Sequence, residues 1–361
     1  MRIVQLLPEL NEGGVERGTV ELSRELVFLG HESIVISAGG ELQKQIEKEG
    51  GRHITLDVCS KNLLTAPKRT KQLRKILKEL QPDIVHARSR VPAWLAYQAN
   101  KTLGFPFVTT VHGFNSVSLY SKIMSKGDVV ICVSESIKHY IQQHYAISEE
   151  EVTVIPRGID LEKFNPENID KKFIKNFKKE YALNDKYIIT TVGRITQLKD
   201  HQTFIRTIAL LKNENLSVIG LIVGGIREDK QEYFNSLKSL IQELNLEKHI
   251  IFTGSQSMVA EIYTLSDVVV SSSKKPESFG RSVAEAIAMN TPVVATNHGG
   301  VLDIIRKNEN GYLYEPEESE GLAVAIEKCK NLEFDGYRYI SENFSLEKMV
   351  RKTLEVYKGL L

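Results

Sequence analysis

The sequence predicts an α/β protein made of two Rossmann-like, doubly wound domains that face each other across a cleft. Two observations predict this fold: short apolar, β-branched runs alternate with longer segments of helical period, and the series starts twice along the chain. Near-continuous apolar strands that alternate with helices are typical of parallel sheets covered on both faces. The length of 361 residues exceeds what one hydrophobic core usually supports, so two domains are expected.

Runs rich in isoleucine, valine and leucine mark the expected strands, because these residues suit a strand that is buried on both faces. In the first half they occupy residues 3–7, 33–37, 54–58, 83–86, 107–111, 129–133 and 152–155. In the second half they occupy residues 187–192, 218–223, 250–253, 268–271 and 293–295. Apolar residues with a helical period lie between them, most clearly at 15–29, 67–80 and 202–211.

A connector between the halves is expected at residues 156–170, where Pro156, Gly158 and Pro166 accompany few apolar residues. The last helical segment has no strand after it, so we expect it to pack back across the domain junction. The expected parts are an N-terminal domain at 1–168, a C-terminal domain at 169–344 and the last helix at 345–361. In such folds, ligands bind at the carboxyl ends of the parallel strands.

The composition argues against several classes of protein. A formal net charge of +1 provides no global basic field for nucleic acid. Cys59, Cys132 and Cys329 lie far apart, so neither a disulfide framework nor a cysteine metal site is expected. The chain enters a strand-like segment at once, and no apolar run is long enough to span a bilayer. We therefore expect a cytoplasmic protein, at most peripheral on the inner face of the cytoplasmic membrane.

Paired glycines, Gly13 and Gly14, follow the first expected strand in the motif Asn11-Glu12-Gly-Gly. Glycine allows close approach of the backbone to a ligand, and the N–H groups at a helix start favour a phosphate. A nicotinamide dinucleotide site would need G-x-G-x-x-G and an acidic residue after the second strand. Here the spacing is G-G-x-x-x-G, which disfavours a dehydrogenase. The alternative is a tight turn from strand to helix.

A second segment of this kind, KPESFGRSVAEA, runs from Lys275 to Ala286 and opens an alanine-rich helix. Glu277 lies in the loop and Glu285 on the helix, so their carboxylates can hold sugar hydroxyls at one end of a ligand and ribose hydroxyls at the other. Phosphates between them would lie against the helix N-terminus. The residues at the helix mouth are Ser278, Phe279 and Gly280.

Two cations follow the first strand of the second half, where Gly193-Arg194 precedes Lys199. Fixed cations stabilise the charge that develops on a departing diphosphate. The alternative is that both are ordinary surface residues. The sequence contains no Asp-x-Asp pair to hold a magnesium or manganese nucleotide complex, so we expect no metal and assign the neutralising role to these cations.

His112 ends another expected strand, in the tetrapeptide T-V-H-G, and we expect it to face the ligand. The alternative for a lone histidine is a place in the core. His86, Arg88 and Arg90 end the preceding strand and are weaker candidates for the same surface.

Together and in this order, the motifs resemble those of glycosyltransferase family 4. PESFGRSVAEA is similar to that family's E-x7-E motif and VGRITQLK to its donor-phosphate motif, while NEGGVER, TVHG, CVSES and VIPRGID are similar to further landmarks. The resemblance covers about residues 2–345. It implies the GT-B fold, no cofactor, no metal, retention of anomeric configuration and a nucleotide-diphosphate sugar, such as a UDP- or GDP-sugar, as the donor substrate.

The resemblance also implies roles for individual residues, with the acceptor on the first domain and the donor on the second. Gly14 would approach the donor phosphate and His112 the transferred sugar, while Arg194 and Lys199 would bind the diphosphate. Glu277 would bind sugar hydroxyls beside the Phe279 and Gly280 amides, and Glu285 would bind the ribose. Arg157 stands where many members carry asparagine, so it receives no role. More loosely, the chain resembles members assigned to lipopolysaccharide core assembly, which implies a saccharide or lipid-linked acceptor.

A basic stretch at residues 52–101 contains eleven lysine or arginine residues and three acidic ones. Within it, residues 61–80 combine an apolar helical stripe, made of Leu73, Ile76, Leu77 and Leu80, with a basic face. The cations expected to act together on an anionic surface are Lys68, Arg69, Lys71, Arg74 and Lys75. One interpretation is electrostatic docking of this stretch on an anionic membrane. The other is an ordinary core helix with a solvated face.

The sequence is compatible with two further functions. A non-hydrolysing nucleotide-sugar epimerase would consume the donor without an acceptor. Loss of Arg194, Lys199 or Glu277 would favour a catalytically silent nucleotide-sugar-binding subunit, and all three residues are present.

Overall fold

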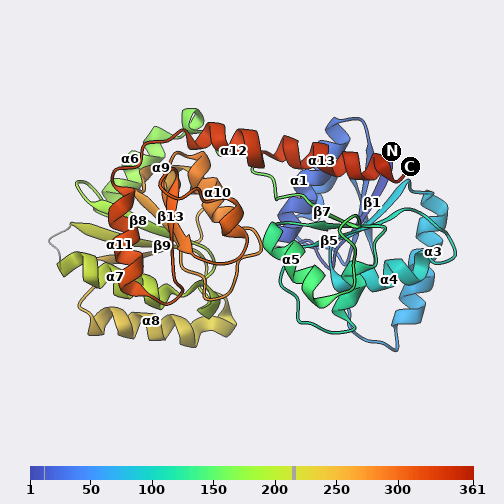
Figure 1. Ribbon diagram of the computed structural model, residues 1–361, viewed down its shortest axis with the longest axis horizontal. Helices are drawn as coiled ribbons and strands as arrows, with labels where there is room; N and C mark the ends of the chain where they lie inside the picture. Colours follow the sequence, from blue (N-terminus) through green and yellow to red (C-terminus); the bar gives the residue numbers. More distant parts are fainter. Residues whose placement is uncertain (12, 214–216) are drawn as a thin grey trace. The chain divides into compact units, whose positions relative to one another are not determined.

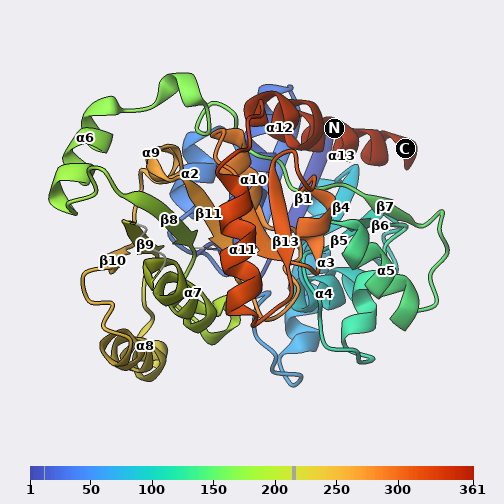
Figure 2. The same cartoon turned by 60° about the vertical axis from the view of Figure 1, so that its left-hand side comes forward.

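A computed structural model describes residues 1–11, 13–213 and 217–361, so Glu12 of the glycine motif lies outside the described residues. The chain forms two compact units (Figures 1 and 2). Unit 1 comprises Met1–Gly158 and Leu346–Leu361, and unit 2 comprises Ile159–Ser345. The chain first passes from unit 1 to unit 2 between residues 158 and 159, which is within the connector expected at 156–170 and before the boundary set at residue 168. The reason is that Ile159 is fully buried in a core of unit 2, where its N–H donates to the Phe344 carbonyl at 2.8 Å.

Unit 1 is a seven-stranded parallel sheet in the order β3-β2-β1-β4-β5-β6-β7. Its strands are β1 Arg2–Leu6, β2 Glu32–Ser37, β3 Arg52–Thr55, β4 Ile84–Ala87, β5 Phe107–Val111, β6 Val129–Cys132 and β7 Val152–Val154. Its helices are α1 Gly14–Phe28, α2 Gln43–Lys48, α3 Ala66–Leu80, α4 Arg90–Asn100, η1 Ser121–Ser125, α5 Glu135–His144 and α13 Leu346–Gly359.

Alternate residues of these strands pack on opposite faces of the sheet, as the pleat requires. Val4 and Leu6 belong to the core cluster beneath α3, α4 and α5, whereas Ile3 belongs to the cluster beneath α1 and α13. Because both faces are buried, the strands are apolar throughout, which is the pattern that predicts a doubly wound sheet. The fold class is confirmed.

Unit 2 is a six-stranded parallel sheet in the order β10-β9-β8-β11-β12-β13. Its strands are β8 Tyr187–Val192, β9 Val218–Val223, β10 Ile250–Gly254, β11 Val268–Ser271, β12 Val293–Thr296 and β13 Gly311–Tyr314. Its helices are η2 Pro166–Asn168, α6 Lys171–Glu180, η3 Gln197–Lys199, α7 His201–Asn213, η4 Glu228–Lys230, α8 Gln231–Glu243, α9 Val259–Leu265, α10 Arg281–Ala288, η5 Gly300–Asp303, α11 Ser319–Cys329 and α12 Gly336–Phe344. Val268 and Val270 pack toward α7, α8 and α11, and Val269 packs toward α9, α10 and α12.

Two strands differ from the sequence-based expectation. The third strand starts and ends earlier than residues 54–58, at Arg52–Thr55, where it pairs in register with β2. The edge strand β13 was not expected from the sequence, because Gly311–Tyr314 is short and only partly buried. Figure 2 shows α11 lying alongside it.

The last helix, α13, belongs to unit 1 although it follows unit 2 in sequence. Leu346, Val350, Leu354 and Tyr357 pack in one cluster with Ile3 and other residues of the first sheet and of α1. Within unit 1, Gly158 lies against Leu346, since a Cβ on Gly158 would come within 2.5 Å of the Leu346 Cα atom. In the described parts of the chain, no helix is both long and apolar enough to span a bilayer.

Candidate active site

The residues predicted for the site form two groups, one on each unit, and each group lies where strands end at the carboxyl edge of its sheet. In unit 1 the glycine pair follows β1 and His112 follows β5. In unit 2 Arg194 and Lys199 follow β8, and the Glu277 loop follows β11. Carboxyl edges of parallel sheets are where ligands of this fold class bind.

In unit 1, Gly13 caps α1 without a side-chain hydrogen bond and Gly14 is the first helical residue. A Cβ on Gly14 would come within 2.6 Å of the Arg157 Nη1 atom, so the guanidinium lies directly over the backbone at the helix start. A helix N-terminus and a guanidinium both favour an anion at this position. Arg157, which received no role from the sequence, is therefore part of the candidate site.

His112 lies beside the same guanidinium, with its Nδ1 atom 3.5 Å from Arg157 Nη2. Arginine has only donors to offer, so Nδ1 is the acceptor and the ring proton is assigned to Nε2. Nε2 is buried and has no hydrogen-bond partner among the described residues. Burial lowers the pKa of His112 well below its ordinary value, and the charges of Arg88 and Arg157 lower it further. The imidazole is thus neutral near neutral pH and presents an N–H group.

Arg88 lies next to this group and is only 6% exposed. Its Nη1 donates to Gln5 Oε1 at 3.2 Å. Among the described residues it makes no ion pair with a carboxylate, and burial lowers its pKa to about 10. A buried cation without a carboxylate partner adds positive potential to this edge of the sheet.

The other two weaker candidates have structural partners. His86 is fully buried, and its ring nitrogens lie 2.6 Å from both the Tyr357 hydroxyl and Thr110 Oγ1. Both ring nitrogens thus have protein partners, and this weaker candidate joins α13 to the sheet. Arg90 donates to Ser121 Oγ at 3.1 Å and so fixes the segment after β5.

In unit 2, the Lys199 ammonium lies 2.6 Å from Glu277 Oε1, which also accepts a hydrogen bond from Ser273 Oγ at 2.6 Å. The Ser272 hydroxyl donates to the Lys199 carbonyl at 2.8 Å and so ties η3 to the end of β11. Gly193 lies against the Lys199 side chain, since a Cβ on Gly193 would lie 3.1 Å from the Lys199 Cε atom. Arg194 is exposed. The two serines were missed by sequence reasoning, although the run of serines after β11 is a signal for them.

The loop from Glu277 to Gly280 is fixed by backbone contacts. Glu277 forms an isolated parallel bridge with Gly299, and its carbonyl accepts a hydrogen bond from the Gly300 N–H at 2.7 Å. Phe279 is buried in the core, and Gly280 caps α10 with a left-handed φ of 99°. The backbone N–H groups at the start of α10 therefore lie at the edge where Lys199 and Glu277 meet.

Glu285 lies one helical turn after Arg281 on α10. Its Oε1 pairs with Arg281 Nε at 2.8 Å, and its Oε2 accepts from the Tyr263 hydroxyl at 3.1 Å. Both partners hold this carboxylate in a defined position. Over the described residues, no group of three or more histidine, cysteine, aspartate or glutamate side chains could hold a metal ion.

Comparison with known proteins identifies the family. The family model "Glycosyltransferase Family 4" matches residues 12–163, and "Glycosyl transferases group 1" matches residues 173–345. A glycosyltransferase from Rickettsia africae, known from its crystal structure, is 36% identical, and the two chains superpose with a TM-score of 0.92 over 99% of this chain and 98% of that one. The chain belongs to glycosyltransferase family 4.

Two further relatives are informative about this glycosyltransferase. The UDP-Gal:α-D-GlcNAc-diphosphoundecaprenol α-1,3-galactosyltransferase of Escherichia coli is 27% identical over 98% of this chain and 95% of its own. The Anabaena protein Alr3699/HepE, solved in complex with UDP, is 19% identical and superposes with a TM-score of 0.87 over 99% of this chain and all (100%) of its own. The latter likeness shows the shared GT-B fold of two Rossmann-like units.

Proposed function

We propose that this glycosyltransferase moves a sugar, a hexose or a related residue, from a nucleotide-diphosphate sugar to a saccharide or lipid-linked acceptor. The observation that carries the proposal is the Lys199 ammonium held 2.6 Å from the Glu277 carboxylate, at a sheet edge next to the start of α10. A fixed cation and a set of backbone N–H groups at one place suit a diphosphate whose charge grows as it departs. A carboxylate beside them suits the hydroxyls of a sugar.

The roles follow from this chemistry. In unit 2, Arg194, Lys199 and the backbone at Gly193 bind the diphosphate, and Glu277 accepts hydrogen bonds from sugar hydroxyls. The residues Ser278, Phe279 and Gly280 supply backbone N–H groups, and Glu285 binds the ribose. In unit 1, the backbone of Gly13 and Gly14 approaches a phosphate, and His112 contacts the transferred sugar. A UDP- or GDP-sugar is the donor substrate, and the UDP complex of the Anabaena protein supports this class of donor.

Transfer proceeds without a metal ion in this proposal, because Arg194 and Lys199 neutralise the diphosphate. It also proceeds with retention. The bond from the anomeric carbon to the β-phosphate oxygen breaks, the acceptor oxygen bonds to the same face, and the acceptor proton passes to the departing phosphate. The Nε2–H group of His112 supports this scheme, since a neutral imidazole that donates there is a hydrogen-bond donor to the sugar and not a base.

The acceptor and the cellular role are inferred from chemistry and from relatives. A lipid-linked acceptor is supported by the Escherichia coli enzyme, whose name gives its acceptor as a diphosphoundecaprenol saccharide. We propose a role in lipopolysaccharide or other cell-surface glycan assembly, by a cytoplasmic enzyme that docks on the inner face of the membrane through residues 61–80. In that segment Lys68, Lys71 and Lys75 are exposed. The expectation that Arg69 and Arg74 share this face is corrected, because both donate to backbone carbonyls.

The test is a thermal-shift screen against a panel of UDP-, GDP- and ADP-sugars with excess EDTA present. A ligand that binds only the folded state raises the melting temperature, by an amount that grows with its concentration over Kd. We expect one class of nucleotide sugar to shift wild type strongly and Lys199→Ala weakly. An α-linked donor of that class should then give an α-linked product, read from its anomeric coupling by NMR.

The outcomes separate the alternatives. Consumption of the donor without an acceptor, with isomerised sugar released, would identify an epimerase. Binding without turnover on any acceptor would identify a silent subunit. A β-linked product would show inversion and make His112 the candidate base. Loss of the donor shift in EDTA, restored by Mg²⁺, would overturn metal independence.

A further inference from the structure

Unit 1 contains a groove of about 890 Å³ that the transfer chemistry does not use. It lies between α3, α4 and the segment that follows β5. Its apolar lining includes Leu63, Ala66, Val91, Trp94, Leu95 and Ile123. This volume is within the range of pockets that bury a small organic ligand.

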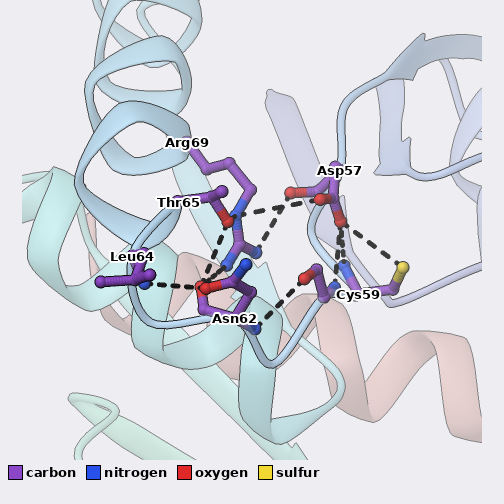
Figure 3. A network of polar contacts seen from close by, with 7 residues as sticks. Asp57, Cys59, Asn62, Leu64, Thr65 and Arg69 are labelled. Carbon is purple, nitrogen blue, oxygen red and sulfur yellow. Dashed lines mark hydrogen bonds and ion pairs between the residues drawn. The ribbon is translucent and has the colours of Figure 1, made fainter.

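Both walls of the groove are held by specific contacts. In one wall, the Arg69 guanidinium reaches from α3 into the loop before it and donates to the Asn62 carbonyl at 2.8 Å and to Thr65 Oγ1 at 3.2 Å (Figure 3). Asp57 Oδ1 accepts from the N–H groups of Cys59 and Ser60 in the same loop. Arg69 is 5% exposed, so a buried cation fixes the loop that precedes α3.

The opposite wall is the segment that carries Leu119 and Tyr120. Trp94 Nε1 donates to the Tyr120 carbonyl at 2.9 Å, and the Arg90 guanidinium lies 5.3 Å from the centre of the Tyr120 ring. The rim is apolar as well as the floor, since Leu63 and Leu119 are each 84% exposed. Leucines that protrude from the mouth of an apolar groove indicate that something apolar enters it.

The charged side chains that line the groove are all positive. The charged side chains that line it, within the described chain, are Lys61, Arg69, Lys122 and Lys126. Arg69 is used in the wall, whereas Lys61, Lys122 and Lys126 form no ion pair with any described carboxylate. An apolar groove with ammonium groups at its margin is complementary to a hydrocarbon chain that carries a phosphate.

Three segments that line the groove begin at the edge of the sheet where unit 1 holds its candidate site residues. Ser60 and Leu63 follow β3, Val91 follows β4 and Arg88, and Leu119 follows β5 and His112. Segments that follow the carboxyl ends of strands in one parallel sheet start at the same edge of that sheet. The three segments that line the groove therefore start at the same edge as His112.

We propose that this groove binds the lipid chain of a phospholipid-type acceptor, with the chain between α3 and α4 and its phosphate at Lys61, Lys122 and Lys126. The inference rests on the proposed transfer to a lipid-linked acceptor and names the part of the enzyme that recognises the lipid. The occupant is the anchor of the acceptor itself, not the lipid of the surrounding bilayer.

The experiment uses the fluorescence of Trp94, which lines the groove and is the single tryptophan among 361 residues. Monomeric decyl phosphate, decanol and inorganic phosphate are titrated separately into the full chain, below the concentration at which the amphiphiles form micelles. We expect a saturable change in emission with decyl phosphate, binding of decanol at least tenfold weaker, and no change with inorganic phosphate. Equal affinity for decanol and decyl phosphate, or an unchanged emission with both, would overturn the proposal.

Two pairs of variants locate the binding. L63S/L119S should weaken decyl phosphate at least tenfold, while F28S, which removes an equally exposed apolar residue from α1, should leave it unchanged. Lys61, Lys122 and Lys126 replaced together by glutamine should weaken decyl phosphate more than decanol. Replacement of Lys68, Lys71 and Lys75, on the exposed face of α3, is the matched control and should leave affinity for monomeric decyl phosphate within twofold. An equal loss of affinity for decyl phosphate in both triple-lysine variants would show adsorption to a charged face and would overturn the proposal.

Failure of this inference is distinguishable from failure of the proposed function. The same preparations are screened for the melting shift with nucleotide sugars, which depends on Lys199 and not on the groove. If a nucleotide sugar raises the melting temperature but decyl phosphate leaves the Trp94 emission unchanged, the proposal of a lipid-binding groove is wrong. The proposed sugar transfer is then unaffected.

Discussion

At the scale of single residues, the contact between Lys199 and Glu277 is the feature with the clearest chemical consequence. The two side chains are 29% and 25% exposed and lie 2.6 Å apart, so water reaches them and a ligand can as well. An ion pair of this exposure contributes little to stability. Its value is in fixing a cation and a carboxylate at one place before the substrate arrives.

We expect Lys199→Met to lower kcat by about 10²–10³-fold, because removal of one preorganised electrostatic contact costs roughly 2.7–4 kcal/mol in the barrier. The melting temperature should change little. Glu317→Gln is the matched control, since it breaks another lysine–glutamate pair, Lys274–Glu317, in the same region of unit 2. A Lys199→Met enzyme with near-normal kcat would remove Lys199 from the diphosphate site.

Buried histidines give unit 1 a defined pH dependence. Burial lowers the pKa of His86 well below its ordinary value, and the charge of Arg88 adds to this. Below about pH 6.5 the unfolded chain binds a proton at this residue and the folded chain does not. The contribution of His86 to the free energy of unfolding is therefore complete above that pH and decreases as the pH falls. His112 behaves in the same direction.

The expected result is measurable in urea, with Trp94 fluorescence reporting on unit 1. Between pH 7.5 and 5.5, the free energy of unfolding of wild type should fall by about 1.4 kcal/mol more than that of His86→Gln. The reason is that pH 5.5 lies about one unit below the pKa of histidine in the unfolded chain. The exposed His139→Gln is the control and should fall as wild type does. If His86→Gln and wild type fall equally, His86 is not held neutral by the fold.

Sequence reasoning predicted these residues unevenly. Lys199, Glu277 and His112 were chosen because each follows a strand end, a feature that local periodicity reveals. Arg157 could not be chosen in this way, since its contacts with Gly14 and His112 join three segments that are distant in sequence. His86 was only a weaker candidate, and its structural role was not evident because its partner Tyr357 lies at the other end of the chain.

At the scale of elements, the turn between β11 and α10 shows how backbone geometry positions the site. Gly280 adopts φ of 99°, and a Cβ there would lie 2.5 Å from Val301 Cγ1. The turn is therefore restricted twice, by its left-handed conformation and by η5 packed against it. Both restrictions keep the first N–H groups of α10 in place.

We expect Gly280→Ala to destabilise unit 2 by about 1–3 kcal/mol and to raise the KM for the donor, because a left-handed alanine is strained and Val301 must move. Gly254→Ala isolates the first cause, since Gly254 has φ of 69° and open space around a Cβ. That control should lose less stability and keep its KM. An equal rise of KM in both variants would mean that the contact with Val301 does not position α10.

Most elements were predictable because their periodicity is set by burial on both sheet faces. The exceptions have physical causes. β13 begins at a glycine and lies at a sheet edge, so its run is too short and too exposed to stand out. Arg69 was counted with a solvated basic face, but it turns inward to satisfy carbonyls of the preceding loop, which helical period alone does not indicate.

At the scale of the whole molecule, the chain has a separate set of cores for each unit. The clusters that contain Leu354 and Leu237 share no residue, and they belong to unit 1 and unit 2 respectively. Each unit therefore has buried cores of its own, and we expect each unit to have its own unfolding transition.

We expect Leu354→Ala to lower the urea midpoint detected by Trp94 fluorescence, at a cost of about 2–5 kcal/mol for a truncated core leucine. Leu237→Ala should shift the transition seen by circular dichroism and leave the Trp94 midpoint near that of wild type. Equal displacement of the Trp94 midpoint by both variants would show that the two units unfold as one.

The place of α13 has a consequence for how the protein is made. Synthesis proceeds from the N-terminus, so the ribosome releases β1 to β7 and then all of unit 2 before the residues that complete the core of unit 1. During that interval Ile3, Leu22 and Ile84 lack the apolar side chains of α13 that cover them in the finished molecule. Until α13 is synthesised, the hydrophobic face of unit 1 that α13 covers stays exposed. Unit 2 is continuous from Ile159 to Ser345, so it can fold as soon as that segment has left the ribosome.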